Sequence, residues 1–253
     1  MGTGEGKVAL VTGASSGIGR ATARAFAQNG YTIFIADLQD ELGRDAAKEC
    51  EKEGVRARFI RCDVTDEESV RSLIAAIIAD QGRLDAAFNN AGIEGQQAST
   101  GDSSTENFDH VIAVNLRGVF LCMREEIRQM LVQPYGGAIV NCSSVAGLIG
   151  LPNIPAYVAS KHGVIGLTRT AALEYAQQDI RVNSVCPGAI STPMLNRYMA
   201  GVPGGEEAMK AIEPVGRIGK PDEIASAVLW LCSSGASFTT GQALAVDGGW
   251  TAK

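Results

Sequence analysis

Short apolar runs alternate with longer amphipathic segments along the whole chain. The short runs are rich in β-branched residues and almost continuously apolar, which is typical of parallel strands covered on both faces. Seven of them predict strands: Val8–Val11, Thr32–Ala36, Ala57–Cys62, Leu84–Phe88, Ala138–Cys142, Arg181–Cys186 and Ala243–Val246. Helices fill the segments between them, so the chain is a succession of β-α-β units. The pattern therefore predicts an α/β fold with one doubly wound parallel sheet of about seven strands and helices on both faces.

Local signals refine this pattern at helix starts and at one interruption. Thr65 is followed by Glu68, and Ser103 by Glu106, which is the spacing of a capping box. The alternation stops over residues 190–219, a stretch rich in glycine, proline and methionine. A long irregular insertion inside a compact domain is usually a lid or a binding loop. We therefore expect a single domain over residues 1–253 with a flexible substrate flap around 190–219.

Composition and charge exclude several classes of protein. The net charge of −6, without a cluster of basic residues, disfavours nucleic acid as a partner. The six cysteines are widely spread, which predicts buried thiols in a reducing compartment rather than disulfides or a metal site. The segment 1–7 has no apolar signal core, and the uncharged stretch 133–160 contains three prolines, so it cannot be one membrane-spanning helix. We expect a cytoplasmic protein with no membrane partner.

A glycine-rich turn follows the first predicted strand and precedes a helix. Its sequence is Thr12-Gly13-Ala14-Ser15-Ser16-Gly17-Ile18-Gly19. Glycines there allow a tight turn and a close approach to a pyrophosphate, and the helix start supplies N–H donors. Glycines also close ordinary strand-to-helix loops, so the evidence lies in the position at the first β-α unit. The turn predicts a dinucleotide site in which Gly13, Ser16, Gly17, Ile18 and Gly19 contact the cofactor.

The second predicted strand is followed by a carboxylate, Asp37. A carboxylate at this place accepts hydrogen bonds from the ribose hydroxyls of NAD and repels the 2′-phosphate of NADP. The neighbours Ala36 and Leu38 are uncharged, as is Ser16 in the glycine-rich turn. The alternative is that Asp37 merely caps the next helix. We favour the first interpretation, which predicts NAD as the cofactor.

Candidate catalytic residues lie in the central part of the chain. Tyr157 and Lys161 are four residues apart on a predicted helix, so they share a face, and a nearby cation allows a tyrosine hydroxyl to transfer protons. The alternative is an amphipathic helix with a packed tyrosine and a solvated lysine. Ser144 follows the carboxyl end of a strand, where it could bind a substrate oxygen or satisfy a local turn. Asn115 interrupts an apolar helical stretch and needs a hydrogen-bonding partner.

Taken together, these motifs resemble the short-chain dehydrogenase/reductase family over residues 7–250. They stand in the family's order: the glycine-rich turn, Asp63-Val64, Asn89-Asn90-Ala91-Gly92, Asn115, Ser144, Tyr157 with Lys161, and Pro187-Gly188. The resemblance implies a Rossmann-type fold. The loop after Gly188 is the main region that it does not define.

The resemblance also implies roles for individual residues. Tyr157 would be the general acid/base, and Lys161 would hold the nicotinamide ribose and favour the phenolate form of the tyrosine. Ser144 would orient the substrate oxygen, and Asn115 would support a water-linked proton path from Lys161. The remaining implied cofactor contacts are Asp63 and Val64 at the adenine, Asn90, Ala91 and Gly92 along the cofactor, Pro187 and Gly188 after the sixth strand, and Ile190 and Thr192 at the carboxamide. A homo-oligomer is implied, with a tetramer favoured and with the Tyr157 helix and the C-terminal strand at its interfaces.

The predicted function is an NAD(H)-dependent oxidoreductase that interconverts a secondary alcohol and its ketone. The substrate is expected to be small and hydrophobic or cyclic, because the predicted pocket is mostly apolar: Glu94, Val145, Leu148, Leu151, Ile154, Gly188 and Met194. Of these, Glu94 lines the pocket or is a solvated loop residue, and we favour the loop. One alternative function is an NADPH-linked 3-oxoacyl-thioester reductase of the same fold. Another is a non-catalytic dinucleotide sensor.

Overall fold

The predicted strands form one parallel sheet in the computed structural model, which describes residues 4–252. The strands are β1 (Val8–Thr12), β2 (Thr32–Asp37), β3 (Ala57–Arg61), β4 (Ala86–Asn89), β5 (Gly137–Cys142), β6 (Ile180–Pro187) and β7 (Ala243–Val246). Their order is β3-β2-β1-β4-β5-β6-β7, and the order reverses between β1 and β4. This arrangement confirms the doubly wound sheet. Residues 1–3 and 253 of the predicted domain lie outside the described residues.

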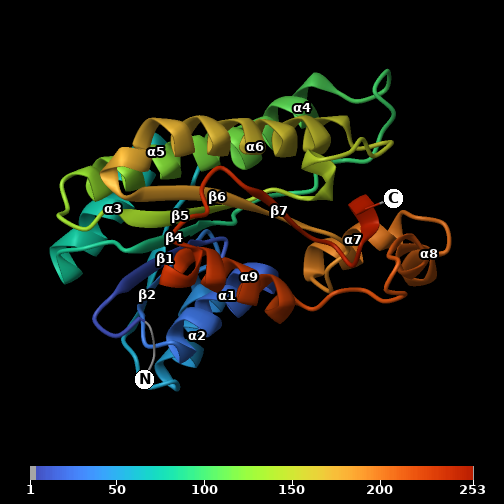
Figure 1. Cartoon of the computed structure of the whole chain (residues 1–253). Helices are drawn as coiled ribbons and strands as arrows, with labels where there is room; N and C mark the ends of the chain where they lie inside the picture. Colours follow the sequence, from blue (N-terminus) through green and yellow to red (C-terminus); the bar gives the residue numbers. More distant parts are fainter. Residues whose placement is uncertain (1–3, 253) are drawn as a thin grey trace.

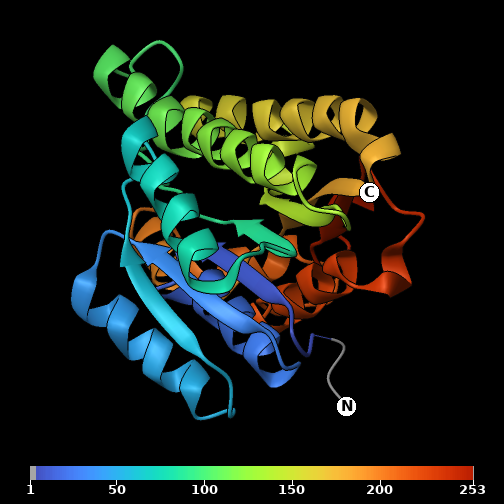
Figure 2. The same cartoon turned by 90° about the vertical axis from the view of Figure 1, so that its left-hand side faces the viewer.

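Helices cover both faces of the sheet (Figures 1 and 2). On one face lie α1 (Gly17–Gln28), α2 (Asp40–Glu51) and α9 (Pro221–Cys232). On the other lie α3 (Glu67–Gln81), α4 (Thr105–Ile112), α5 (Gly118–Leu131) and α6 (Pro155–Tyr175). Successive residues of β1 point to opposite cores, with Val11 packed in one cluster and Leu10 in the other. Two cores explain why the strand sequences are continuously apolar.

Both predicted capping boxes are placed one residue too early. The N-cap of α3 is Asp66, whose carboxylate accepts a hydrogen bond from the backbone N–H of Glu68. The N-cap of α4 is Ser104 rather than Ser103. Thr65 lies one residue before this cap, and both its hydroxyl and its backbone N–H donate to the carboxylate of Asp63, at 2.7 and 2.9 Å. A tertiary arrangement of the loop thus determines which of two adjacent polar residues caps the helix.

The segment 190–219, called the flap below, was predicted to be irregular, and this prediction is wrong. It contains α7 (Pro193–Ala200) and α8 (Gly205–Ile212), which lie beyond the carboxyl ends of the strands (Figure 1). Thr192 starts α7, because its hydroxyl accepts a hydrogen bond from the N–H of Leu195 at 3.1 Å and Pro193 occupies the first turn. A parallel bridge between Ile190 and Gly219 joins the two ends of the flap.

Two expectations from composition can be compared with the structure. The six cysteines are free thiols, and all of them are buried, as predicted. The stretch 133–160 contains β5, a short 3₁₀ helix (Val145–Gly147) and the first residues of α6. Within residues 4–252, no helix has the length and apolar character needed to cross a membrane.

Candidate active site

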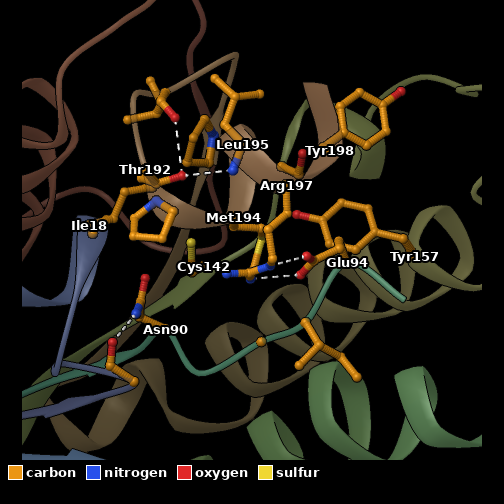
Figure 3. A pocket seen from close by; sticks show the side chains of 18 of the residues that line it. Ile18, Asn90, Glu94, Cys142, Tyr157, Thr192, Met194, Leu195, Arg197 and Tyr198 are labelled. Atoms are coloured by element: carbon orange, nitrogen blue, oxygen red, sulfur yellow. Dashed lines mark hydrogen bonds and ion pairs between the residues drawn. The ribbon is translucent and has the colours of Figure 1, made fainter. Parts of the chain in front are cut away.

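A cavity of about 840 Å³ lies at the carboxyl ends of the strands (Figure 3). Most of the predicted site residues line it: Gly13, Ser16, Gly17, Ile18, Asp37, Asp63, Val64, Asn90, Ala91, Gly92, Ser144, Tyr157, Lys161, Pro187, Gly188, Ile190 and Thr192. Gly19 and Asn115 are not among the lining residues, and Leu148 is absent from the substrate wall where it was expected. The fold thus brings residues from all parts of the chain to the place where open parallel sheets bind ligands.

The glycine-rich turn is packed directly against the loop that follows β4. A Cβ on Gly13 would lie 2.7 Å from the Cα of Ala91, and one on Gly19 would lie 2.3 Å from the carbonyl oxygen of Gly13. The side-chain amide of Asn90 donates to the carbonyl oxygens of Thr12 and Gly13 at 3.1 and 3.0 Å. Gly19 therefore allows the turn to close, and Asn90 holds the turn in place.

Asp37 is bound to the glycine-rich turn. One carboxylate oxygen accepts the backbone N–H of Ser15 at 3.0 Å, and the other accepts the N–H of Gln39 at 3.1 Å. The N-cap residue of α2 is Gln39, so Asp37 does not simply cap the helix. The carboxylate lines the cavity beside Leu38, and the turn holds it in position.

A basic residue that is distant in sequence lies near Asp37. Arg61 on β3 is the register partner of Asp37, so the sheet places an arginine next to it. The guanidinium of Arg61 donates to the carbonyl oxygen of Leu38 at 3.0 Å and to the carboxylate of Asp40 at 2.6 Å. Arg61 is not among the residues that line the cavity, and Asp40 balances its charge.

Tyr157 and Lys161 lie on the first turns of α6, which begins at Pro155. The ammonium nitrogen of Lys161 is 5.4 Å from the centre of the Tyr157 ring and donates to the carbonyl oxygen of Cys142 at 2.8 Å. Lys161 is only 4% exposed, so the alternative of a solvated lysine is wrong. An ammonium group has three N–H donors, and the remaining ones can bind further oxygen atoms in the cavity.

Asn115 is fully buried in a π-helical turn, Ala113–Arg117, between α4 and α5. Its side-chain amide donates to the carbonyl oxygen of Ile93 and accepts the N–H of Ile93, both at 2.8 Å. It also donates to the hydroxyl of Ser160 at 3.3 Å, and that hydroxyl donates to the carbonyl oxygen of Tyr157. The expected partners of Asn115 therefore exist, and they connect the loop after β4 to the helix that carries Tyr157.

Ser144 makes the local hydrogen bond of a turn serine. Its hydroxyl oxygen accepts the backbone N–H of Ala146 at 3.1 Å and caps a short 3₁₀ helix, Val145–Gly147. Because a hydroxyl group has one donor and two acceptor positions, Ser144 can still donate a hydrogen bond into the cavity that it lines. The local role and a role toward a ligand are therefore compatible.

Glu94 is an ion-paired residue of the cavity wall, so the favoured interpretation as a solvated loop residue is wrong. Its carboxylate receives two hydrogen bonds from Arg197 on α7, at 2.6 and 3.1 Å (Figure 3). Burial raises the pKa of Glu94, but the hydrogen bond from Arg197 and a backbone hydrogen bond outweigh it and lower the pKa overall. The two residues are 103 positions apart, so no local pattern could have predicted this pair.

Comparison with known proteins shows relatives of similar length. A family model described as enoyl-(acyl carrier protein) reductase matches residues 13–251. The 2,5-dichloro-2,5-cyclohexadiene-1,4-diol dehydrogenase of Sphingobium indicum is 44% identical over 98% of this chain and 98% of its own. Cyclohexanol dehydrogenase of an Acinetobacter species is 44% identical, covering 98% and 96%. Cis-4-hydroxycyclohexanecarboxylate dehydrogenase of Sinomonas cyclohexanicum is 44% identical, covering 97% of both chains.

Solved structures agree with these relatives. Levodione reductase superposes with a TM-score of 0.95 and 37% identity, covering 98% of this chain and 99% of its own. An NAD⁺-bound xylitol dehydrogenase superposes with a TM-score of 0.93 and 37% identity, covering 97% and 99%. The family model, the relatives and the arrangement of the cavity lead to one assignment. The chain belongs to the short-chain dehydrogenase/reductase family, whose members are oxidoreductases with a nicotinamide cofactor.

Proposed function

We propose that this protein is an NAD(H)-dependent dehydrogenase that interconverts a secondary alcohol on a small ring and the corresponding ketone. The main support for this proposal is that one cavity is lined by Tyr157, the buried Lys161 and Ser144 together with the glycine-rich turn. The substrate end of that cavity has a mostly apolar wall, including Val145, Leu151, Ile154 and Met194. Three relatives with 44% identity have names that describe oxidation of cyclic alcohols, which supports a ring as the substrate.

The residues present fit a dinucleotide. Gly13 and Gly17 have φ values of 62° and 54°, which favour glycine, so the main chain can turn tightly into α1. The N–H groups and the helix dipole at the start of α1 would favour the pyrophosphate anion. Asp37 stands where the ribose hydroxyls of the adenosine would lie, and Asp63 and Val64 would border the adenine. Asn90, Ala91, Gly92, Pro187, Gly188, Ile190 and Thr192 would line the rest of the cofactor. When bound, the nicotinamide would supply the hydride acceptor or donor.

The side chains would manage the proton and the geometry of the substrate. Ser144 would donate a hydrogen bond to the substrate oxygen and hold the carbinol carbon in place. In oxidation, Tyr157 would take the proton of the alcohol, and in reduction it would return that proton to the carbonyl oxygen. The buried ammonium of Lys161 would stabilise the phenolate and bind the nicotinamide ribose. Asn115 would keep the loop after β4 and α6 at a constant distance.

The alternative is an NADPH-linked 3-oxoacyl-thioester reductase of the same fold, and the description of the matching family model as enoyl-(acyl carrier protein) reductase supports a thioester but not the 3-oxo group. Asp37 favours NAD, because a carboxylate fixed by the Ser15 N–H would repel a 2′-phosphate. The test measures turnover of cyclohexanol and of a 3-oxoacyl thioester with both cofactors by nicotinamide absorbance. We expect oxidation of cyclohexanol with NAD⁺. Preference for NADPH and the thioester would overturn the proposal.

We also propose that the protein is a cytoplasmic homotetramer. Two exposed apolar side chains support an assembly: Leu173 on α6 is 85% exposed, and Phe238 before β7 is fully exposed. Six buried free thiols fit a reducing compartment. Light scattering coupled to gel filtration should give four times the chain mass of 26.4 kDa. A single-chain mass at micromolar concentration would contradict the proposed assembly.

A further inference from the structure

The flap contributes a charged residue to a cavity wall that is otherwise mostly apolar at the substrate end. Among the described residues that line the cavity, the lysines and arginines are Lys161 and Arg197. Lys161 lies deep, bound to the carbonyl oxygen of Cys142. Arg197 comes from α7 and reaches Glu94 on the loop after β4, so the pair spans the substrate side of the cavity (Figure 3). The cation available to a substrate is therefore already paired.

Glu94 occupies two N–H donors of the Arg197 guanidinium in the way that the carboxylate of a ligand would. Nε of Arg197 donates to Oε1 of Glu94 at 2.6 Å, and Nη2 donates to Oε2 at 3.1 Å. Two parallel N–H donors on two carboxylate oxygens form the bidentate arrangement by which arginine recognises carboxylates. A second bond, from the side-chain amide of Gln97 to the carbonyl oxygen of Tyr198 at 3.2 Å, holds the same two segments together.

We propose that the Glu94–Arg197 pair makes this enzyme selective for uncharged ring substrates over ring carboxylates. The inference rests on the proposed function and specifies its substrate class. Glu94 holds the place on Arg197 that a substrate carboxylate would need. Neutral ring alcohols and ketones enter without disturbing this pair.

The cost to an anionic substrate has two sources. A carboxylate that displaces Glu94 leaves that residue unpaired in a wall where its side chain is only 24% exposed. A carboxylate that leaves the pair intact stays unpaired itself, next to the negative charge of Glu94. In both cases the anion loses hydration without gaining a counter-charge, whereas an uncharged ring loses only water from apolar surface.

The test compares two substrates that share a ring and a secondary alcohol: cyclohexanol and cis-4-hydroxycyclohexanecarboxylate. The quantity measured is the ratio of their kcat/KM values with NAD⁺, neutral over anionic. For the wild-type enzyme, this ratio should be 10 or more. Glu94→Gln removes the negative charge while keeping the size of the side chain, so the ratio should fall at least fivefold. Arg197→Gln leaves the carboxylate of Glu94 without its counter-charge, so the ratio should rise.

The opposite directions separate selectivity from a general loss of the flap's structure, which would lower both kcat/KM values together. The matched control is Glu68→Gln on α3, which alters an exposed ion pair with Arg71 away from the cavity. That variant should keep the wild-type ratio. A wild-type ratio near one, or ratios in Glu94→Gln and Arg197→Gln within twofold of wild type, would overturn the inference.

A binding measurement keeps this inference separate from the proposed reaction. Cyclohexanecarboxylate, which has no hydroxyl group to oxidise, is titrated into each variant and its dissociation constant is measured by calorimetry. Glu94→Gln should bind it at least fivefold more tightly than wild type. If no ring alcohol is oxidised but this tightening is found, the proposed function fails and the selectivity stands. If ring alcohols are oxidised but Glu94→Gln does not bind cyclohexanecarboxylate more tightly, the proposed selectivity fails and the proposed function stands.

Discussion

The two halves of the cavity are held together by different kinds of contact. Around the β1–α1 turn, backbone atoms are in close contact: a Cβ on Gly13 or Gly19 would lie less than 3 Å from the neighbouring main chain. Under the flap, side chains make the contacts, as in the pair of Glu94 with Arg197. Backbone contacts tolerate no added atom, whereas a side-chain pair can break and form again. We infer that the first half is rigid and that the second half adapts to the substrate and opens.

Tyr157 lines the cavity that both halves enclose, and its substitution should have the largest effect. Tyr157→Phe keeps the aromatic ring but removes the hydroxyl group that would transfer the proton, so kcat should fall roughly a hundredfold or more. Cofactor affinity should change little, because the glycine-rich turn and Asp37 are untouched. Lys161→Met should reduce both quantities, since the ammonium is proposed to bind the ribose as well. Stopped-flow kinetics and cofactor titration measure the two effects, and a near-normal kcat in Tyr157→Phe would contradict the mechanism.

A buried carboxyl group, Glu126, lies next to the rigid half. It should make the free energy of unfolding depend on pH. Glu126 on α5 is fully buried and accepts a hydrogen bond from the side-chain amide of Asn89, the neighbour of Asn90, at 2.9 Å. Burial raises the pKa of Glu126 from 4.5 to about 8, partly offset by that hydrogen bond. Glu126 also acts on the thiol of Cys122, whose pKa is raised by burial and then by the charge of Glu126. The folded protein therefore keeps a proton that the unfolded chain releases.

The sign of the pH dependence follows from this difference. Between pH 4.5 and about 8 the unfolded state binds fewer protons than the folded state, so each unit of rising pH lowers the free energy of unfolding. Glu126→Gln removes this contribution and should be more stable than wild type near pH 8 by about 2–4 kcal/mol. The difference should shrink toward pH 4.5. Urea titrations of both proteins across this range measure it, and parallel curves would show that Glu126 ionises normally.

A single added methyl group should break the rigid half. Gly19→Ala places a Cβ 2.3 Å from the carbonyl oxygen of Gly13, so the turn must shift. Cofactor affinity should fall at least tenfold, as measured by fluorescence titration with NADH. Gly101→Ala is the matched control, because nothing lies within 4 Å of its Cβ position. Equal affinities in the two variants would mean that the turn is not the cofactor cradle.

Cofactor choice should change by a smaller factor when Asp37 is replaced. Asp37→Ala removes two ribose acceptors and a negative charge, so the preference for NAD⁺ over NADP⁺ in kcat/KM should drop about tenfold. Arg61, the register partner of Asp37, then supplies positive charge beside the place of a 2′-phosphate. Asp37→Ala/Asp40→Asn, which also releases Arg61 from its ion pair, should shift the preference further. A wild-type enzyme that already prefers NADP⁺ would disprove this role of Asp37.

The smallest expected effect concerns the flap itself. We expect the flap to open and close over the cavity, with its ends held by the Ile190–Gly219 bridge. Limited proteolysis should cut within residues 193–212 two- to threefold faster without ligands than with NAD⁺ and substrate together. Equal cutting rates in both conditions would exclude an opening flap. Cleavage elsewhere in the chain serves as the internal reference.

Local sequence was sufficient wherever function depends on neighbours along the chain. Seven strands, the glycine-rich turn, Asp37 and the Tyr157–Lys161 spacing are each encoded within a few residues, because strand and helix periodicity and the β-α turn are local properties. The order of these motifs then indicated the family. The limits of this approach are visible at the helix starts, where Asp66 and Ser104 rather than their neighbours are the caps.

Pairings between residues far apart in the chain could not be predicted from local sequence. The strands, the glycine-rich turn and the spacing of Tyr157 and Lys161 could be predicted from local sequence. Folding brought Arg197 to Glu94 and Arg61 to the side of Asp37. It also buried Glu126 where, among residues 4–252, the side chain of Asn89 is the hydrogen-bond partner. The physical reason is that charge and burial depend on what packs around a side chain, and that environment is assembled from distant segments. Hence the reaction class could be predicted from motifs, while the proposed selectivity for uncharged rings required the structure.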